Sequence, residues 1–208
     1  MKEIIKRSFD IIISGAVLII GAPIFVIIAL LIRLDSQGPV FYFHPRVGLN
    51  GKCFKFWKFR SMVIDADEIL FSNPKFYKKL RSGSHKLKDD PRVTKVGKII
   101  RRTSVDEIPQ FWNVLKGEMS FVGPRAYRPD EVRLYTDNKE SEVGKKFSTV
   151  LSVKPGITGA WQVSGRSALS FEDRVGLDAE YAKNWTIGMD LWIMLKTPMA
   201  VIEGEGAM

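Results

Sequence analysis

The sequence predicts a helix-rich α/β fold with a small β-hairpin and a membrane helix near its N-terminal end. The segment Ile11–Ile32 contains no charged residue and, as a helix, is long enough to cross a hydrocarbon core of about 30 Å. Two short apolar segments, Pro39–Phe43 and Phe54–Phe59, are expected to be strands. Asn50-Gly51 lies between them and favours a tight turn, so the two strands should form a hairpin. Helix start and stop signals follow farther along the chain.

A proline and two basic flanks shape the expected membrane segment. The apolar stretch is too long for a signal peptide, and Pro23 near its middle predicts a kink or a break. Basic residues stand on both sides of it: Lys2, Lys6 and Arg7 before, Arg33 and Arg46 after. Because such residues favour the cytoplasmic side, a re-entrant helix with both ends on one face fits as well as a kinked spanning helix. Asp10, at the edge of the segment, is expected to snorkel or to pair with Arg7.

The composition fits one folded domain with an anionic partner. The chain has 208 residues, of which 45% are hydrophobic and 26% charged, so it is not a disordered chain. Lys and Arg exceed Asp and Glu by 32 to 23, which gives a formal charge of +9. This charge attracts nucleic acid, acidic lipid headgroups or phosphorylated substrates, and it also fits a soluble basic protein. Cys53 is the only cysteine, which excludes an intramolecular disulfide and fits a reducing compartment. His44 and His85 are far apart in sequence, so no histidine-rich metal site is expected.

Local signals are less decisive for three later segments. Ser61–Leu70 is expected to be helical, whereas Ser72–Lys95, rich in Lys, Ser, Gly, Asn, Asp and Pro, is interpreted largely as a loop. The tail Trp185–Ile202 has few charges and contains several Trp and Met residues. It fits an amphipathic helix in the membrane surface and a helix packed on the domain's own core equally well.

Two further helices have marked ends. The first should run from near Asp106 to Lys116 and end at Gly117, because glycine readily adopts the left-handed conformation that follows many helices. The second should begin at Ser170, which has the spacing of a capping pair with Asp173.

The stretch Arg101–Gln110 carries the strongest chemical signal. Ser104 and Glu107 have capping-box spacing, which gives one helix frame. Asp106 as N-cap gives a second frame, which we favour because it places Pro109 where its missing N–H costs nothing. In both frames Asp106 lies at the start of a helix, where backbone N–H groups and the helix dipole favour a carboxylate or a bound phosphate.

A carboxylate in this position has a chemical use. An ionised aspartate can attack phosphorus and form an acyl-phosphate. Attack on a phosphate diester requires Arg, Lys or a metal ion to offset its charge. Arg101 lies just upstream of Asp106, and Lys58 and Arg125 could converge on it from other elements. Taken alone, an acidic pair at a helix start is more often structural, because it complements the helix dipole.

The motifs taken together resemble the monotopic phosphoglycosyl transferases, the bacterial initiating sugar transferases, over nearly the whole chain. After a basic start and one hydrophobic segment with a central proline, the segments that carry the resemblance are Phe54–Met62, Gly97–Arg101, Asp106-Glu107, Asn113–Arg125, Lys154–Gly159 and Gln162–Arg166. Each is short, but all of them in this order make a specific pattern.

The resemblance implies a reaction and a role for each site residue. This family transfers a sugar-1-phosphate from a UDP-sugar to polyprenyl (undecaprenyl) phosphate, releases UMP and uses Mg²⁺. By matching position, Asp106 is expected to be the covalent nucleophile and a metal ligand, with Glu107 as its partner in a catalytic dyad. The basic residues expected around the phosphates are Lys58, Arg101 and Arg125.

The resemblance also implies a membrane topology. Residues 1–33 are expected to form a re-entrant membrane helix broken at Pro23, and residues 34–208 a catalytic domain on the cytoplasmic face of the bacterial inner membrane. The family often has Ser-Pro at the break, whereas this chain has Ala22-Pro23, which leaves the sharpness of the bend less defined. Because the larger members have additional N-terminal membrane helices, we expect a small-form enzyme or an excised catalytic domain.

The expected partners are a UDP-sugar, polyprenyl phosphate and membrane lipids, with no nucleic acid and with a homodimer left open. Two other classes of protein remain as alternatives. A membrane-tethered nucleic-acid-binding module explains the charge and the alternating aromatic and basic residues of Phe54–Arg60. A structural membrane-surface protein explains Ile11–Ile32 and the Trp-containing tail. Neither explains Asp106-Glu107 with its flanking pattern.

Overall fold

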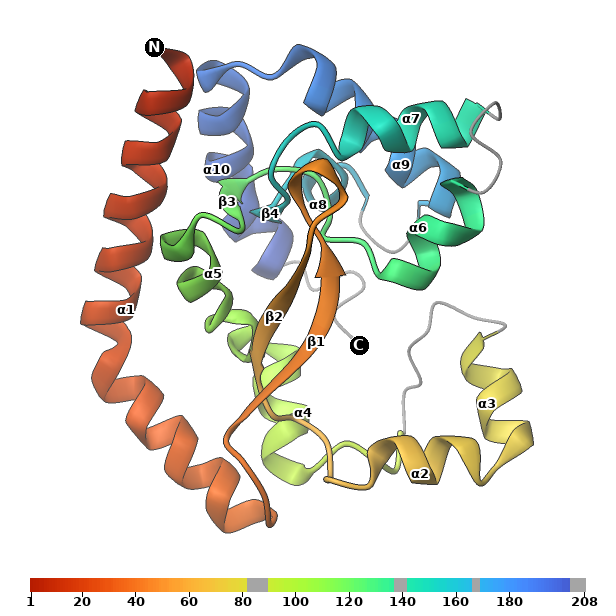
Figure 1. Ribbon diagram of the computed structural model, residues 1–208. Helices are drawn as coiled ribbons and strands as arrows, with labels where there is room; N and C mark the ends of the chain where they lie inside the picture. Colours follow the sequence, from red (N-terminus) through yellow and green to blue (C-terminus); the bar gives the residue numbers. More distant parts are fainter. Residues whose placement is uncertain (82–89, 137–141, 166–168, 203–208) are drawn as a thin grey trace.

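The computed structural model describes residues 1–81, 90–136, 142–165 and 169–202 (Figure 1). A long helix, α1 (Lys2–Asp35), runs along one side of the molecule, and the shorter helices and two small sheets lie on its inner side. In chain order the other elements are β1 (Phe41–Val47), the 3₁₀ turn η1 (Leu49–Gly51), β2 (Cys53–Phe59), α2 (Ala66–Phe71), α3 (Pro74–Arg81), α4 (Lys95–Arg102), the 3₁₀ turn η2 (Val105–Glu107), α5 (Gln110–Lys116), β3 (Ser120–Val122), α6 (Pro129–Thr136), α7 (Glu142–Val150), β4 (Gly156–Thr158), α8 (Ala160–Val163), α9 (Phe171–Asn184) and α10 (Ile187–Ile202). This arrangement confirms the helix-rich α/β class with a small β-hairpin.

Helix α1 is the one helix in the described part of the chain that is long and apolar enough to cross a membrane. It exposes many large apolar side chains, among them Ile12, Ile19, Ile20, Ile24, Val26, Ile27 and Leu30. Exposure of so many apolar side chains is unfavourable in water, and a lipid phase would cover them. The helix continues through Pro23 and curves around the body, so the structure shows a bend in an uninterrupted helix (Figure 1). Its re-entrant arrangement in a membrane stays a prediction.

Polar contacts join the N-terminal part of α1 to the domain, and they differ from the expected ones. The prediction that Asp10 snorkels or pairs with Arg7 is wrong. Asp10 is buried and accepts hydrogen bonds from Ser120 Oγ at 2.9 Å and from Phe121 N at 2.8 Å. Arg7 donates to two carbonyls in the last turn of α5, at 2.6 and 2.7 Å. Carbonyls at a helix end lack helical partners, so a cation both satisfies them and complements the helix dipole.

The expected hairpin is present. Strands β1 and β2 pair antiparallel from Phe41 opposite Phe59 to Val47 opposite Cys53. Asn50 and Gly51 form the turn with φ of 55° and 76°, a region in which Asn and Gly cost least. The first strand is longer than expected because this register extends pairing to Val47.

The segment between β2 and α4 holds more helix and less loop than its composition predicts. Helix α2 starts only at Ala66, because the residues before it pair with another segment: Met62 bridges Val93, and Thr94 N donates to Ser61 O. Ser72–Lys95 was expected to be largely loop, yet it contains helix α3. Residues 82–89 of this stretch lie outside the described residues.

Local capping signals farther along the chain are confirmed. The Ser170 side chain accepts a hydrogen bond from Asp173 N and begins α9 as its N-cap. In the tail, one side of α10 packs on the core of the domain, and the other side exposes apolar residues as a helix in the membrane surface would. Ile193 is buried against Val122 and Tyr181, whereas the opposite side exposes apolar side chains, Leu191, Trp192, Leu195 and Met199.

Candidate active site

Asp106 and Glu107 lie in a tight turn that precedes a helix. The chain leaves α4 through Ser104, whose φ is 56°, forms η2 and starts α5 at Gln110 with Pro109 as N-cap. Both expected helix frames are therefore wrong, because Ser104 makes no side-chain capping bond and Asp106 is not the N-cap of α5. The C-terminal end of α5 is as expected, since it ends at Lys116 before the left-handed Gly117. Both acidic residues therefore lie in η2, before α5 begins.

Lys58 reaches both carboxylates from β2. Its Nζ lies 2.6 Å from Glu107 Oε1 and 3.5 Å from Asp106 Oδ2. The side chain of Asp106 is 10% exposed, that of Lys58 23% and that of Glu107 42%. The three charges thus form a cluster that is deepest at Asp106 and open at Glu107. A contact between β2 and η2, which are far apart in sequence, creates this cluster.

The electrostatic environment favours a protonated Asp106 more than water does. Burial raises the pKa of the Asp106 carboxyl, and the Glu107 charge raises it further. Lys58 and Arg101 oppose this shift because their positive charges stabilise the ionised form, yet the net pKa is raised. Burial lowers the pKa of the Lys58 ammonium, but Glu107 and Asp106 outweigh burial and leave that pKa raised. Lys58 therefore stays positively charged beside the two carboxyl groups.

The hairpin presents more functional groups than the sequence suggested. Tyr42 on β1 lies opposite Lys58 on β2, so the two side chains are on the same face of the hairpin. Side chains two residues apart along a strand also share a face, so His44 and Arg46 point to the same side as Lys58. Arg46 Nε donates to His44 Nε2 at 2.7 Å, and Arg46 Nη1 donates to Ala126 O at 3.0 Å. Burial and the neighbouring Arg46 and Lys58 lower the pKa of His44 to about 3, so its imidazole is neutral and accepts from Arg46.

Arg125 is held in a second basic group. Its backbone N donates to the buried Asp178 Oδ2 at 2.9 Å. Its guanidinium lies 5.3 Å from the ring centre of Trp161, and Arg174 from α9 lies 5.8 Å from the same ring. Burial, and then repulsion by the positive charge of Arg125, lower the pKa of Arg46 to about 10. Anions relieve such repulsion, so this group favours a phosphorylated ligand.

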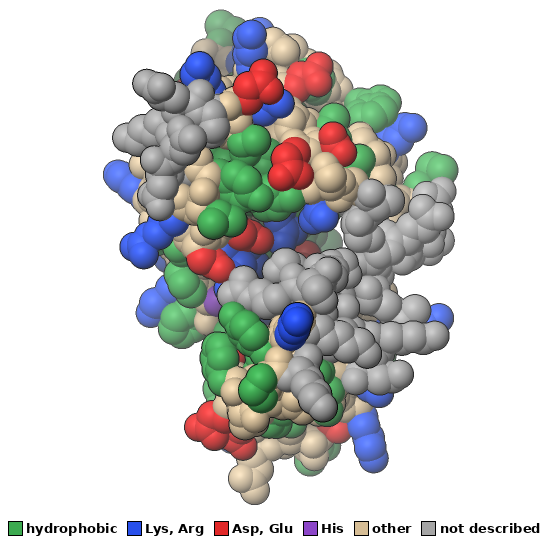
Figure 2. Space-filling model, turned by 90° about the vertical axis from the view of Figure 1, so that its right-hand side faces the viewer, with side chains coloured by type: hydrophobic (Ala, Val, Ile, Leu, Met, Phe, Trp, Pro, Cys, Tyr) green, Lys and Arg blue, Asp and Glu red, His purple; other side chains and the backbone are tan. Residues whose placement is uncertain are grey.

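The structure thus brings the expected residues together in different ways. Lys58 contacts the dyad directly, Arg101 acts on Asp106 through its charge, and Arg125 stands with Arg46 and Arg174. Figure 2 shows Lys and Arg side chains gathered in a hollow of the face opposite α1, with Asp and Glu side chains beside them. Sequence reasoning missed Arg46, His44 and Arg174. Alternation along β1 would have indicated the first two if the strand had been extended to Val47.

The carboxylate pair fits a magnesium ion that also binds substrate. Mg²⁺ is usually held by one or two carboxylates together with water and phosphate oxygens. Asp106 and Glu107 supply two carboxylates around one ammonium group. Within the described ranges no group of three or more Asp, Glu, His or Cys side chains could hold a metal ion. These residues therefore suit a cation that arrives with a phosphorylated substrate better than one caged by protein alone.

Known proteins resemble this chain over nearly its whole length. The family described as bacterial sugar transferase matches residues 1–204. Undecaprenyl-phosphate galactose phosphotransferase of Salmonella typhimurium is 43% identical over 209 residues, which are 99% of this chain and 42% of that protein. Exopolysaccharide production protein ExoY of Sinorhizobium fredii is 42% identical over 206 residues, 97% of this chain and 87% of that protein. Undecaprenyl-phosphate glucose phosphotransferase of Komagataeibacter xylinus is 40% identical over 200 residues, 92% of this chain and 35% of that protein.

The chain therefore spans less than half the length of the Salmonella and Komagataeibacter relatives and most of the length of ExoY. The matches confirm the expected transferase class. On the family match and on these identities over nearly its whole length, the chain belongs to the bacterial sugar transferase family.

Proposed function

We propose that this chain transfers a sugar-1-phosphate from a UDP-sugar to undecaprenyl phosphate, giving polyprenyl-diphosphate-sugar and UMP. The observation that carries the proposal is the buried Asp106 carboxylate beside Lys58 and Glu107, with the charges of Arg46 and Arg125 close by. Such a reaction is the first membrane step of bacterial polysaccharide or glycoconjugate assembly. The names of the Salmonella and Komagataeibacter relatives, which act on undecaprenyl phosphate, support the same chemistry.

The first step uses only the UDP-sugar. An Asp106 carboxylate oxygen attacks the phosphorus that carries the sugar, and the bond from this phosphorus to the bridging oxygen breaks. The electron pair leaves with UMP, and the sugar-phosphate remains on Asp106 as an acyl-phosphate. Lys58 lies where it can offset charge on the transferred phosphoryl group, and Arg46, Arg125 and Arg174 form the basic surface for the rest of the diphosphate.

The second step uses only the lipid. A phosphate oxygen of undecaprenyl phosphate attacks the same phosphorus, a new diphosphate bond forms, and the Asp106 carboxylate leaves with its electron pair. Two displacements at one phosphorus regenerate the free enzyme. Asp106 suits both roles because burial makes its ionised form reactive, while the nearby Lys58 stabilises that form when it leaves.

The distances suggest a role for Glu107. Lys58 Nζ lies 2.6 Å from the Glu107 carboxylate and 3.5 Å from the Asp106 carboxylate, so it is 0.9 Å closer to Glu107. A tight pair with Lys58 would occupy the attacking oxygen of Asp106. Glu107 holds the ammonium group near Asp106 without allowing that tight pair, so we assign it the positioning of Lys58.

Mg²⁺ would be held by Asp106 and Glu107 together with the substrate phosphates, where it would supply positive charge to the leaving group. We place residues 34–208 on the cytoplasmic face of the bacterial inner membrane. Residues 1–33 would anchor them as a helix that enters and leaves on one side at the bend near Pro23.

Release of UMP tests the reaction and separates it from the alternatives. Purified protein in detergent is incubated with a panel of UDP-sugars, Mg²⁺ and undecaprenyl phosphate. Sustained UMP release that requires both the lipid and one particular UDP-sugar is expected. No release from any UDP-sugar, together with salt-sensitive binding of RNA or DNA, would favour a membrane-tethered nucleic-acid-binding module instead.

A further inference from the structure

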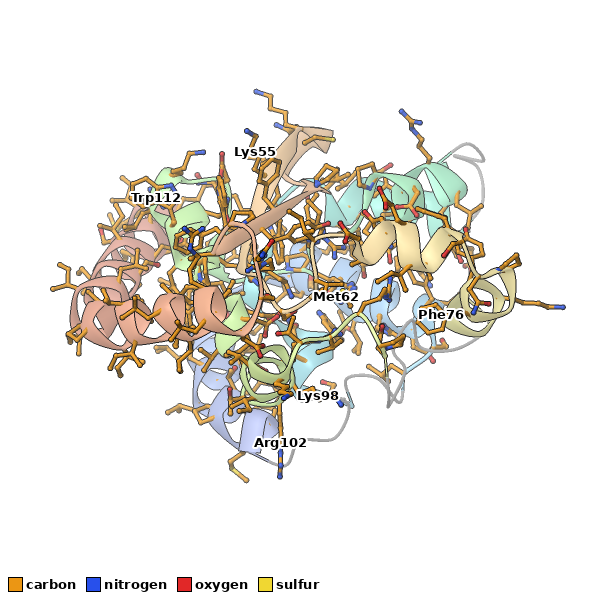
Figure 3. The ribbon with its side chains drawn as sticks, turned by 90° about the horizontal axis from the view of Figure 1, so that it is seen from below. Lys55, Met62, Phe76, Lys98, Arg102 and Trp112 are labelled. Carbon is orange, nitrogen blue, oxygen red and sulfur yellow. The ribbon has the colours of Figure 1, made fainter. Side chains whose placement is uncertain are left out.

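An apolar cavity of about 320 Å³ lies beside the catalytic turn. Its walls come from α1, from the hairpin and from the junction of η2 with α5, and the residues that line it are Leu18, Phe25, Phe41, Trp57, Phe59, Ile108, Pro109 and Trp112. All eight side chains are apolar or aromatic. Figure 3 shows Trp112 on α5 beside α1, at this edge of the molecule. Apart from the indole N–H groups of Trp57 and Trp112, these side chains offer no hydrogen-bond partner to the hydroxyl and phosphate groups of a sugar nucleotide.

Part of the cavity wall lies close to Asp106 and Glu107. Ile108 and Pro109 directly follow Asp106-Glu107, so their Cα atoms lie within about 8–12 Å of that of Asp106, at 3.8 Å per residue. Strand β2 separates two environments, because successive side chains point to opposite faces. Lys58 points towards the carboxylates, whereas Trp57 and Phe59 line the cavity. A ligand that has both a phosphate and a hydrocarbon chain matches these two environments: its phosphate suits the side of Lys58, and its chain suits the side of Trp57 and Phe59.

The far wall of the cavity belongs to the membrane helix. Leu18 and Phe25 line the cavity, and the residues around them on α1 expose apolar side chains: Ile19, Ile20, Ile24, Val26 and Ile27. At the rim, Trp112 is 53% exposed and Phe41 49% exposed, so the cavity is open to the surroundings of α1. A hydrocarbon chain can therefore pass from lipid into the cavity without crossing a polar surface. Pro23 lies between the two α1 residues, so the bend there shapes this wall.

We propose that this cavity binds the first isoprene units of the lipid acceptor and thereby places its phosphate at Asp106. This inference rests on the proposed function and assigns the acceptor to a site that the sugar nucleotide does not use. An apolar cavity of roughly 150 Å³ accommodates a benzene ring, so this cavity accommodates on the order of two isoprene units. The rest of the chain would remain in the membrane along α1.

Filling the cavity tests the proposal. Leu18→Trp adds bulk on the wall formed by α1, and Ile19→Trp makes a comparable change at the next residue, which is 76% exposed and is not among the cavity residues. Leu18→Trp should raise the KM for undecaprenyl phosphate at least about tenfold and slow discharge of the loaded enzyme by the lipid. It should leave the lipid-independent release of UMP at the rate of Ile19→Trp and of the wild type.

Acceptor length and a second variant keep the test decisive. For the wild type, acceptors with one, two and three isoprene units should improve up to the second unit, and Leu18→Trp should remove most of this dependence. Trp112→Ala, at the exposed rim, should raise the same KM if Leu18→Trp does not fold. Wild-type KM values and length dependence in these cavity variants would overturn the proposal. Failure of the wild type to release UMP from any UDP-sugar would instead refute the proposed function.

Discussion

At the residue scale, the proposed reaction depends on how Lys58, Glu107 and Asp106 share charge. Burial is the largest influence on Asp106 and raises its pKa, whereas Lys58 lowers it. In the proposed mechanism Asp106 attacks as a carboxylate, so the rate should fall as the pH falls through a pKa that lies above the ordinary value of 3.8. The acid limb of the pH profile therefore reports directly on this carboxyl group.

Removal of the Lys58 ammonium group should move the acid limb of the pH profile. Lys58→Met eliminates the charge that favours ionised Asp106, so the acid limb should shift to higher pH and the maximal rate should fall on the order of a hundredfold. The measurement is the rate of UMP release without lipid, as a function of pH. Lys55→Met, an exposed position on the same strand, serves as the control. An unchanged limb in Lys58→Met would show that Lys58 does not act on the nucleophile.

The two arginines predicted from the sequence should act on different parameters. Arg101→Ala should lower kcat, because its charge acts on Asp106. Arg125→Ala should mainly raise the KM for the UDP-sugar, because Arg125 lies with Arg46 and Trp161 in the basic group. Each loss should be on the order of a hundredfold in kcat/KM, with little change in thermal melting. Near-normal kcat/KM in both variants would remove these residues from the site.

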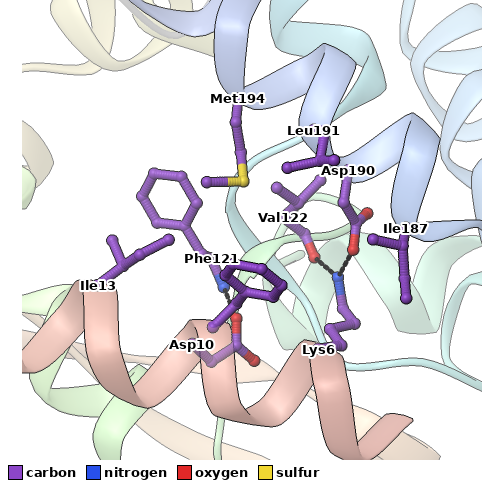
Figure 4. A pocket seen from close by; sticks show the side chains of 10 residues that line it. Lys6, Asp10, Ile13, Phe121, Val122, Ile187, Asp190, Leu191 and Met194 are labelled. Carbon is purple, nitrogen blue, oxygen red and sulfur yellow. Dashed lines mark hydrogen bonds and ion pairs between the residues drawn. The ribbon is translucent and has the colours of Figure 1, made fainter. Parts of the chain in front are cut away.

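At the element scale, the attachment of α1 determines whether the domain and the membrane helix act as one unit. Figure 4 shows how polar contacts close this joint: Lys6 Nζ lies 2.5 Å from Asp190 Oδ2 and 2.9 Å from Val122 O, while Asp10 accepts from Phe121 N. The same helix lines the apolar cavity farther along. Removing one of these contacts should therefore lower the stability of the protein first and its use of the lipid acceptor second.

Asp10→Ala should destabilise the protein by about 2–4 kcal/mol, because it leaves the Ser120 hydroxyl and the Phe121 N–H without their buried acceptor. For a chain of this size the melting temperature in detergent should fall by roughly 4–16 °C. Asp65→Ala, at an exposed position, should change it little. Equal melting of the two variants would show that Asp10 does not hold α1 to the domain.

The elements that could be predicted from the sequence are those whose cause is local. The Asn50-Gly51 turn and the Ser170 cap are set by a few neighbouring residues, and both are confirmed. Asp106-Glu107 could be picked out, but its helix frame could not, because the left-handed Ser104 gives no clear sequence signal. The contact of Asp10 with Ser120 could not be foreseen, since it joins segments 110 residues apart.

At the scale of the whole molecule, we expect α1 to set the orientation of the protein relative to the membrane. Both ends of the expected membrane segment carry basic residues, and the helix bends near Pro23, so Met1 and Arg33 should lie on the same cytoplasmic side. Single cysteines near each end, with Cys53 replaced by serine, can be labelled in intact cells by a reagent that does not cross the membrane. Neither should react until the cells are opened. Labelling of the N-terminal cysteine from outside would indicate a spanning helix.

In the proposed mechanism, Asp106 carries the sugar-phosphate between the two steps. Intact-protein mass spectrometry after incubation with the UDP-sugar and Mg²⁺, without lipid, tests it most directly. The wild type and Asp65→Asn should gain the mass of one sugar-phosphate, peptide mapping should place it on Asp106, and undecaprenyl phosphate should remove it. Asp106→Asn should fold and gain nothing. An adduct on another residue, a fully active Asp106→Asn enzyme, or turnover by the wild type without any adduct would refute this role of Asp106.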